Sequence, residues 1–196
     1  MRKPGRQLTI GLIALAALAA AGCGSSDGGG SKPPDYEKAL AGSPPPLAAL
    51  HAQENELLDG GVEAYEKRIA ELRGYPVVVN VWASWCGPCR LEFPAFQQMA
   101  ARYGKRVAFL GVDSQDSDDF ARDFLRDSPV PYPSYTDPDE EIADSIGASR
   151  GLPATAFYDR DGELLYFTYI PYAEQEDLQA AIESCALGRP PVCESG

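Results

Sequence analysis

Residues 77–94 read VVVNVWASWCGPCRLEFP and join a predicted strand to a predicted helix. The apolar run 77–82 is typical of a strand covered on both faces of a sheet, and the helix is predicted over 90–103. Cys86 and Cys89 therefore lie at a helix N-terminus, where free N–H groups and the helix dipole favour a thiolate. We expect Cys86 to cap the first turn and face outward, with Cys89 shielded one turn further in.

The two-residue spacing between the cysteines indicates dithiol–disulfide chemistry. Cysteines in such C-x-x-C settings have pKa values of roughly 3.5 to 7.5, against about 8.5 for a free thiol. The exposed sulfur of Cys86 can attack a partner disulfide, and the shielded sulfur of Cys89 can resolve the mixed disulfide. Gly87 leaves room for the partner's backbone, and Pro88 stands where its missing N–H costs nothing.

Two other uses of a C-x-x-C motif fit this chain less well. A zinc site needs a second pair of ligands with a similar spacing, and the remaining candidates do not supply one. A purely structural disulfide between such close cysteines would constrain little of the unfolded chain. The sequence therefore predicts no metal and no organic cofactor. The remaining candidate ligands are Cys23, Cys185, Cys193 and His51.

Residues 78–94 resemble the thioredoxin superfamily, and more narrowly its membrane-tethered TlpA/ResA-like thiol:disulfide oxidoreductases. Residues 151–157, GLPATAF, are similar to the cis-proline segment that faces the active site in that family. The resemblance extends over about residues 60–186. It implies an α/β thioredoxin-like fold, with a central mixed β-sheet flanked by helices and a central insert.

The resemblance also assigns roles to residues outside the cysteine pair. It implies that Trp85 and Pro153 shape the surface on which a partner docks, with a cis bond between Leu152 and Pro153. Asn80 stands where thioredoxin has a buried aspartate, and an amide cannot take up a proton. Glu92 is the nearest carboxylate, and the resemblance implies that it tunes the cysteine pair. The alternative for Glu92 is a solvated position on the helix face.

The composition sets limits on the partners. The chain has 196 residues, 44% of them hydrophobic, which suits one domain with an appendage. Its net charge of −12 argues against nucleic acid and anionic lipid as partners. An acidic surface would steer a basic protein partner, and it would equally keep a soluble domain well solvated.

The N-terminal region reads as an export signal followed by a tether. Residues 1–22 combine a basic start, an apolar run over 8–21 and small residues before Cys23, which resembles a lipoprotein signal peptide. We expect a lipid on Cys23; ordinary cleavage nearby and an uncleaved anchor are the alternatives. Gly, Ser and Pro predict a flexible tether over 23–46 and a domain over 47–196. This places the protein in a bacterial cell envelope, on the outer face of the cytoplasmic membrane.

The rest of the chain predicts alternating helices and strands. The segment 47–58 is ambiguous, because its spacing is roughly helical where TlpA-like families usually place a β-hairpin. A helix opening at Ser117 should turn Phe120, Phe124 and Leu125 inward. The other predicted elements are helices over 61–73, 140–146 and 173–186, strands over 107–112, 154–159 and 163–169, and an extended piece over 134–136.

Cys185 and Cys193 are predicted to form a structural disulfide, because cysteines in an exported protein usually pair. A second redox pair and two free thiols are the alternatives.

The resemblance implies a disulfide reductase of the cytochrome c maturation type. Gly-Pro between the cysteines resembles the reducing members of the superfamily. The partners would be protein thiol or disulfide substrates, with apocytochrome c as a candidate, and a membrane thiol electron donor or acceptor. The alternatives are an oxidase that forms disulfides in exported proteins and a non-catalytic binding module on the same fold. A peroxiredoxin would need Pro-x3-Thr/Ser-x2-Cys, which is absent around Cys86.

Overall fold

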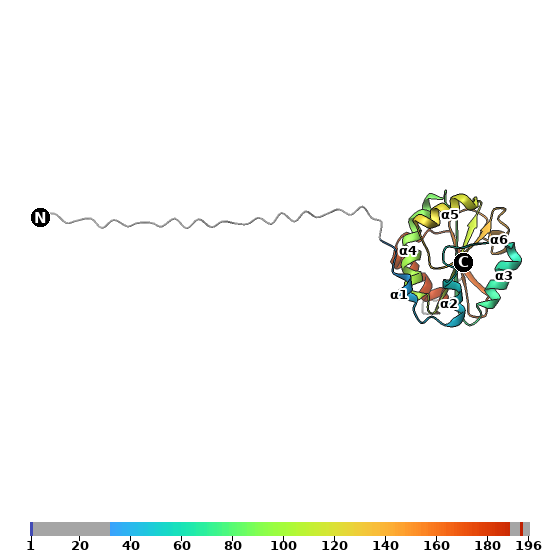
Figure 1. Ribbon diagram of the computed structural model, residues 1–196, viewed down its shortest axis with the longest axis horizontal. Helices are drawn as coiled ribbons and strands as arrows, with labels where there is room; N and C mark the ends of the chain where they lie inside the picture. The colour runs from blue at the N-terminus through green and yellow to red at the C-terminus, as the bar shows by residue number, and fades with distance from the viewer. Residues whose placement is uncertain (2–31, 189–192, 194–196) are drawn as a thin grey trace. The chain divides into compact units, whose positions relative to one another are not determined.

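A six-stranded mixed sheet crosses the domain in the order β1-β4-β3-β2-β5-β6. The computed structural model describes Met1, residues 32–188 and Cys193 (Figure 1). The pairs from β1 to β2 are parallel, while β5 is antiparallel to β2 and to β6. The strands are β1 (Leu57–Leu58), β2 (Val77–Trp82), β3 (Ala108–Ser114), β4 (Ser134–Asp137), β5 (Ala154–Tyr158) and β6 (Leu164–Thr168).

β2 and β3 lie at the centre of the sheet, and every residue of both strands is buried. Such runs suit parallel strands that helices cover on both faces. The two strands pair in register, with Val77 beside Ala108. The predicted strand over 77–82 is confirmed with its bounds, and the strand predicted over 107–112 is observed over Ala108–Ser114.

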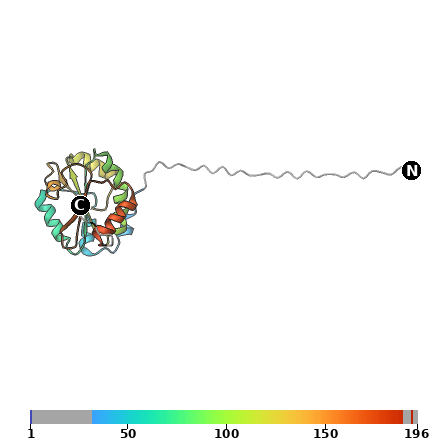
Figure 2. The ribbon, with the colours of Figure 1, turned by 180° about the vertical axis from the view of Figure 1, so that it is seen from behind.

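Helices cover both faces of the sheet. Figure 1 shows α1 and α4 on one side and α3 and α6 on the other, and Figure 2 shows the C-terminal helix on the α4 side. The helices are α1 (Tyr36–Leu40), α2 (Pro45–His51), α3 (Gly61–Glu71), α4 (Gly87–Tyr103), α5 (Asp118–Asp127), α6 (Glu141–Ser145) and α7 (Gln175–Ala181). α7 continues into a π-helical turn, Ile182–Ala186, so the predicted helix over 173–186 divides in two.

Two apolar clusters fill the space between the sheet and its helices. Successive side chains of a strand point to opposite faces. Val78 and Trp82 of β2 thus join the α4-side cluster, which also contains both cysteines of the C-x-x-C motif. Val79 and Val81 join the cluster on the opposite face. The predicted mixed sheet with flanking helices is confirmed, while the central insert stays a prediction.

The folded domain begins before the predicted boundary at residue 47. α1 lies in the expected tether, yet Leu40 is buried and the Tyr36 hydroxyl donates to the Pro129 carbonyl at 2.9 Å. Asp35 caps this short helix. The surrounding Gly and Pro residues concealed a helix too short to give a periodic signal.

The structure resolves one ambiguity of the sequence and corrects one further expectation. The ambiguous segment 47–58 forms most of α2 and the two-residue β1, which pairs with β4 in place of a family β-hairpin. Phe120 is 67% exposed, because α5 buries the stripe formed by Ala121, Phe124 and Leu125. Within the described ranges, no helix combines the length and apolar character needed to span a membrane.

Candidate active site

The two cysteines of the motif are joined as a disulfide at the first turn of α4. Cys86 is the N-cap residue, and its Sγ accepts the backbone N–H of Cys89 at 3.2 Å. Gly87 and Pro88 open the helix, which therefore begins before the predicted start at Arg90. Free N–H groups and the helix dipole at this position stabilise negative charge on the capping sulfur after reduction.

The surroundings of the motif are open on one side. Trp85 is 60% exposed, whereas Cys86 is 4% exposed and Cys89 is fully buried. Cys86 is therefore much less exposed than the sequence predicts, because its sulfur lies against the first turn in the disulfide. It is still more exposed than Cys89, as expected. A Cβ placed on Gly87 would meet no atom within 4 Å, so the backbone there is accessible to a partner chain.

Glu92 is a fully buried carboxyl group one helical turn beyond Cys89. Its Oε1 accepts Asn80 Nδ2 at 2.6 Å, and its Oε2 accepts the backbone N–H of Tyr172 at 3.0 Å. Burial raises the pKa of Glu92 to about 7, and the bonds from Tyr172 and Asn80 offset this effect only in part. A solvated helix-face position is thereby excluded. The effect of Glu92 on the cysteine pair stays a prediction.

The polar surroundings of Glu92 continue across the sheet to β5. Asn80 on β2 is paired directly with Thr155 on β5. Among the residues that the structure describes, Asn80 Oδ1 and Thr155 Oγ1 have no hydrogen-bond partner. Both side chains are buried polar groups beside the Glu92 carboxyl. Sequence reasoning missed Thr155 as a polar neighbour of this site.

The cis-proline segment lies at the start of β5, which pairs with the strand that leads to the cysteines. The peptide bond between Leu152 and Pro153 is cis, as the sequence predicts. Ala154 pairs with Val81, and Leu152 packs against the apolar cluster that contains both cysteines. The fold thus brings together two motifs that are far apart in the chain.

Residues after β3 hold the loop that precedes Cys86. The backbone N–H of Ser84 donates to Asp116 Oδ2 at 2.5 Å, and Trp85 Nε1 donates to the Gln115 carbonyl at 2.9 Å. Burial, followed by the nearby Asp116 carboxylate, raises the pKa of Asp113 to about 8. Sequence reasoning missed these residues; the only signal was an acidic residue inside the apolar run of β3.

The remaining cysteines lie outside the C-x-x-C motif. Cys185 and Cys193 form a second disulfide. Its structural role stays a prediction. Cys23 lies outside the residues that the structure describes. Over residues 32–188 and Cys193, no group of three or more His, Cys, Asp or Glu side chains could hold a metal ion.

Residues 50–167 match the AhpC/TSA family, which extends over more than half of the chain. The chain belongs to this family. It is 33% identical to the thiol:disulfide interchange protein DsbE of Escherichia coli (strain K12), over 81% of this chain and 82% of the relative. It is 25% identical to the thiol-disulfide oxidoreductase ResA of Bacillus thuringiensis (strain Al Hakam), over 53% of this chain and 60% of the relative.

The fold is similar to solved structures of the same kind. A secreted Mycobacterium tuberculosis disulfide oxidoreductase homologous to E. coli DsbE matches with a TM-score of 0.51 and 28% identity. This match covers 57% of the chain and 82% of the neighbour. The predicted thioredoxin-like fold and the resemblance to the TlpA/ResA-like oxidoreductases are confirmed. The protein is accordingly a thiol:disulfide oxidoreductase of the DsbE and ResA type.

Proposed function

We propose that the protein is a disulfide reductase of the cytochrome c maturation type, anchored by lipid to the outer face of the cytoplasmic membrane. The Cys86–Cys89 disulfide at the start of α4, with Cys86 as the helix cap, is the observation that carries the reaction. The similarity to the DsbE and ResA proteins supports the class of chemistry. The pattern that ends at Cys23 supports the anchor.

The reaction begins with the reduced dithiol. The Cys86 thiolate attacks one sulfur of a substrate disulfide, forms a mixed disulfide and releases the other substrate sulfur as a thiolate. The helix N-terminus supports this role because it stabilises the anionic sulfur of Cys86.

Cys89 completes the reaction from within the domain. Its thiolate attacks Cys86 Sγ, which closes the intramolecular disulfide and releases the second substrate thiol. Two electrons pass from the dithiol to the substrate. Glu92 is the group proposed to accept the Cys89 proton, because its raised pKa lets it exchange protons near neutral pH. A membrane thiol donor then returns two electrons to the Cys86–Cys89 disulfide.

Substrate docking is proposed to use the surface between Trp85 and Pro153. Proline has no N–H, so Pro153 leaves neighbouring backbone groups free for a substrate chain. The open space at Gly87 supports an extended chain crossing the motif. Apocytochrome c is the candidate substrate on grounds of resemblance.

The same dithiol can run in the opposite direction as an oxidase. The reduction potential separates the two: a value near roughly −270 mV indicates a reductant, and one near roughly −120 mV indicates an oxidant. We expect the protein to lie at the reducing end. A redox titration of Cys86–Cys89 against a thiol buffer, followed by mass after acid quenching, makes this measurement.

Trapping tests the two cysteine roles. In the native envelope, Cys89→Ser should accumulate mixed disulfides through Cys86, because attack remains and resolution is lost. Cys86→Ser, the matched control, should trap nothing. Non-reducing gels after acid quenching, followed by mass spectrometry, identify the captured protein.

Each result of the trapping experiment has a distinct meaning. A captured apocytochrome c supports the reductase, and a spread of unrelated exported proteins favours the oxidase. If Cys86→Ser traps proteins and Cys89→Ser does not, Cys89 is the attacking cysteine and Cys86 the resolving one. If neither variant traps a protein and the wild type exchanges with no disulfide, a non-catalytic binding module replaces the proposal.

A further inference from the structure

A hollow of about 390 Å³ lies directly beside the dithiol loop. Ser84 and Trp85 form one wall, immediately before Cys86, and the other wall belongs to α5. The proposed reaction does not use this hollow. Its residues Ser84 and Trp85 precede Cys86 directly in the chain, so the hollow lies within reach of a substrate segment joined to Cys86.

The rim of the hollow is aromatic. Trp85 is 60% exposed and Phe120 is 67% exposed, while Phe124 is buried beneath them. Trp85 Nε1 is already bonded to the Gln115 carbonyl, so the indole offers its apolar ring and not its donor. Two large aromatic side chains beside one hollow suit an apolar side chain of a partner.

The α5 wall of the hollow is acidic. Phe120, Asp123, Phe124 and Asp127 recur at three and four residues, so one face of α5 carries the aromatic and the acidic residues together. Asp127 has no hydrogen-bond or ion-pair partner among the residues that the structure describes. Its carboxylate is therefore available to a cation from outside.

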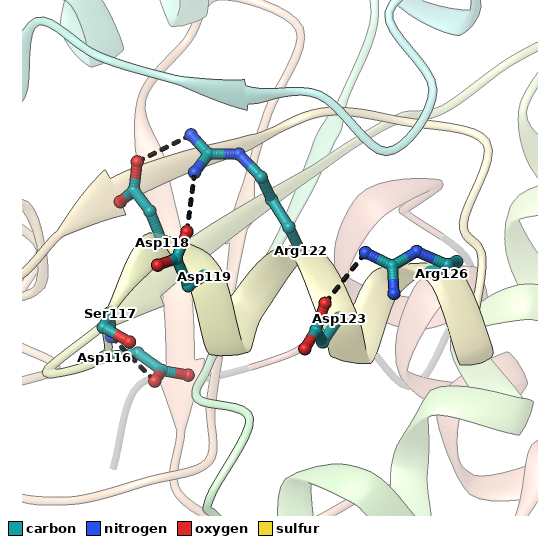
Figure 3. A network of polar contacts seen from close by, with 7 residues as sticks. All are labelled: Asp116, Ser117, Asp118, Asp119, Arg122, Asp123 and Arg126. Carbon is teal, nitrogen blue, oxygen red and sulfur yellow. Dashed lines mark hydrogen bonds and ion pairs between the residues drawn. The ribbon is translucent and has the colours of Figure 1, made fainter.

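The arginines near this wall are already engaged. Figure 3 shows Arg122 folded back on Asp118 and Asp119, and Arg126 on Asp123. The guanidinium that lines the hollow belongs to another arginine, Arg90. It donates to the Ser84 carbonyl and lies 4.8 Å from the centre of the Phe124 ring. These contacts hold Arg90 at Ser84 and Phe124 without neutralising its positive charge. The Asp127 carboxylate is the acidic group of the hollow that no described contact pairs.

We propose that this hollow, between Trp85 and α5, binds the substrate segment next to its reacting cysteine and selects an apolar side chain adjacent to Lys or Arg. The apolar side chain contacts Trp85 and Phe120, and the cation lies against Asp127. This inference rests on the proposed dithiol reaction and specifies which protein substrates it favours. The chain's net charge of −12 would bring such basic segments to the site.

The test uses the reduced full-length protein and three disulfides. Two are peptide disulfides that carry Phe-Lys or Gly-Glu beside the cysteine, and the third is hydroxyethyl disulfide, which is uncharged and has no side chains. The measured quantity is the second-order rate constant for oxidation of the protein. We expect the Phe-Lys peptide to react about tenfold faster than the Gly-Glu peptide in the wild type.

Substitutions on the rim of the hollow separate the contribution of the aromatic contact from that of the charge. Phe120→Ala should reduce the ratio of the Phe-Lys to the Gly-Glu rate constant about threefold. Asp127→Asn should reduce this ratio about two- to fivefold at low salt, with less effect at high salt. Asp119→Asn, on the same helix, and Leu164→Ala, an exposed apolar residue of β6, are the controls and should leave it unchanged. All four variants should react with hydroxyethyl disulfide at the wild-type rate.

The outcomes separate this inference from the function on which it rests. Equal rates for the two peptides in the wild type would overturn the inference and leave the dithiol reaction intact. An unchanged preference in both Phe120→Ala and Asp127→Asn would do the same. Failure of the wild type to react with any of the three disulfides would overturn the proposed function and this inference with it.

Discussion

Glu92 is the side chain whose protonation the fold shifts toward neutral pH beside the cysteines. Its pKa rises from 4.5 to about 7, so the folded state binds more protons than the unfolded chain between these values. The free energy of unfolding therefore falls as pH rises through that window. Glu92→Gln should remove the part of this decline that Glu92 causes, about 3 kcal/mol. The part that follows from the raised pKa of Asp113 should remain. Urea unfolding of the disulfide form from pH 4.5 to 7.5 measures the decline.

Glu37→Gln is the matched control for this prediction, because it removes an exposed carboxyl group on α1. This variant should keep the pH dependence of the wild type. The baseline stability of Glu92→Gln will also change, since an amide cannot accept bonds from both Asn80 and Tyr172 as a carboxylate does. The slope with pH is thus the diagnostic quantity. Equal slopes in wild type and Glu92→Gln would contradict the raised pKa.

Residues could be predicted where the local sequence defines their chemistry. Cys86 and Cys89 are evident from their spacing and from the strand and helix around them. Tyr172 is not, because it meets Glu92 only through a contact between residues 80 positions apart. The same limit applies to Asp116, whose bond to Ser84 exists only after β2 and β3 have paired.

At the scale of elements, α1 tests where the folded domain begins. Leu40 is buried and its helix packs near α4. Leu40→Ala should therefore lower the free energy of unfolding by about 2–3 kcal/mol, through lost burial and a cavity. Lys38→Ala changes an exposed residue of the same helix and should alter it by less than about 0.5 kcal/mol. Urea unfolding compares the two variants. If Leu40→Ala unfolds at the same urea concentration as the wild type, α1 does not stabilise the folded domain.

Elements could be predicted where they are long or fully buried. The sequence predicts β2 with its observed bounds, because a largely apolar run directly before a helix start has few alternatives. α1 was missed because five residues cannot show a helical period. The sequence predicts Phe120 inward, because periodicity alone does not fix which edge of an apolar stripe faces the sheet. In the structure α5 buries the neighbouring stripe of Ala121, Phe124 and Leu125 instead.

At the scale of the whole molecule, the net charge and the predicted lipid anchor bear on which partners the dithiol would meet. The net charge of −12 and the acidic wall of α5 would both favour the basic protein segments proposed above. A lipid anchor would restrict the search for these partners to the membrane surface. The sequence predicts this anchor from residues 1–23, which lie outside the described residues apart from Met1.

Cys23 provides the test of the anchor. Mass spectrometry of the membrane fraction should find Cys23 as the mature N-terminal residue, carrying acyl chains, because the small residues before it suit a lipoprotein signal peptidase. Cys23→Ala should lack the acyl mass, whereas Cys193→Ser, which removes a different cysteine, should retain it. Two or more acyl chains hold a domain stably at a bilayer, so the wild type should resist extraction by high salt. Release of the wild type as a soluble, unacylated protein would remove the anchor from the proposal and leave the dithiol chemistry unchanged.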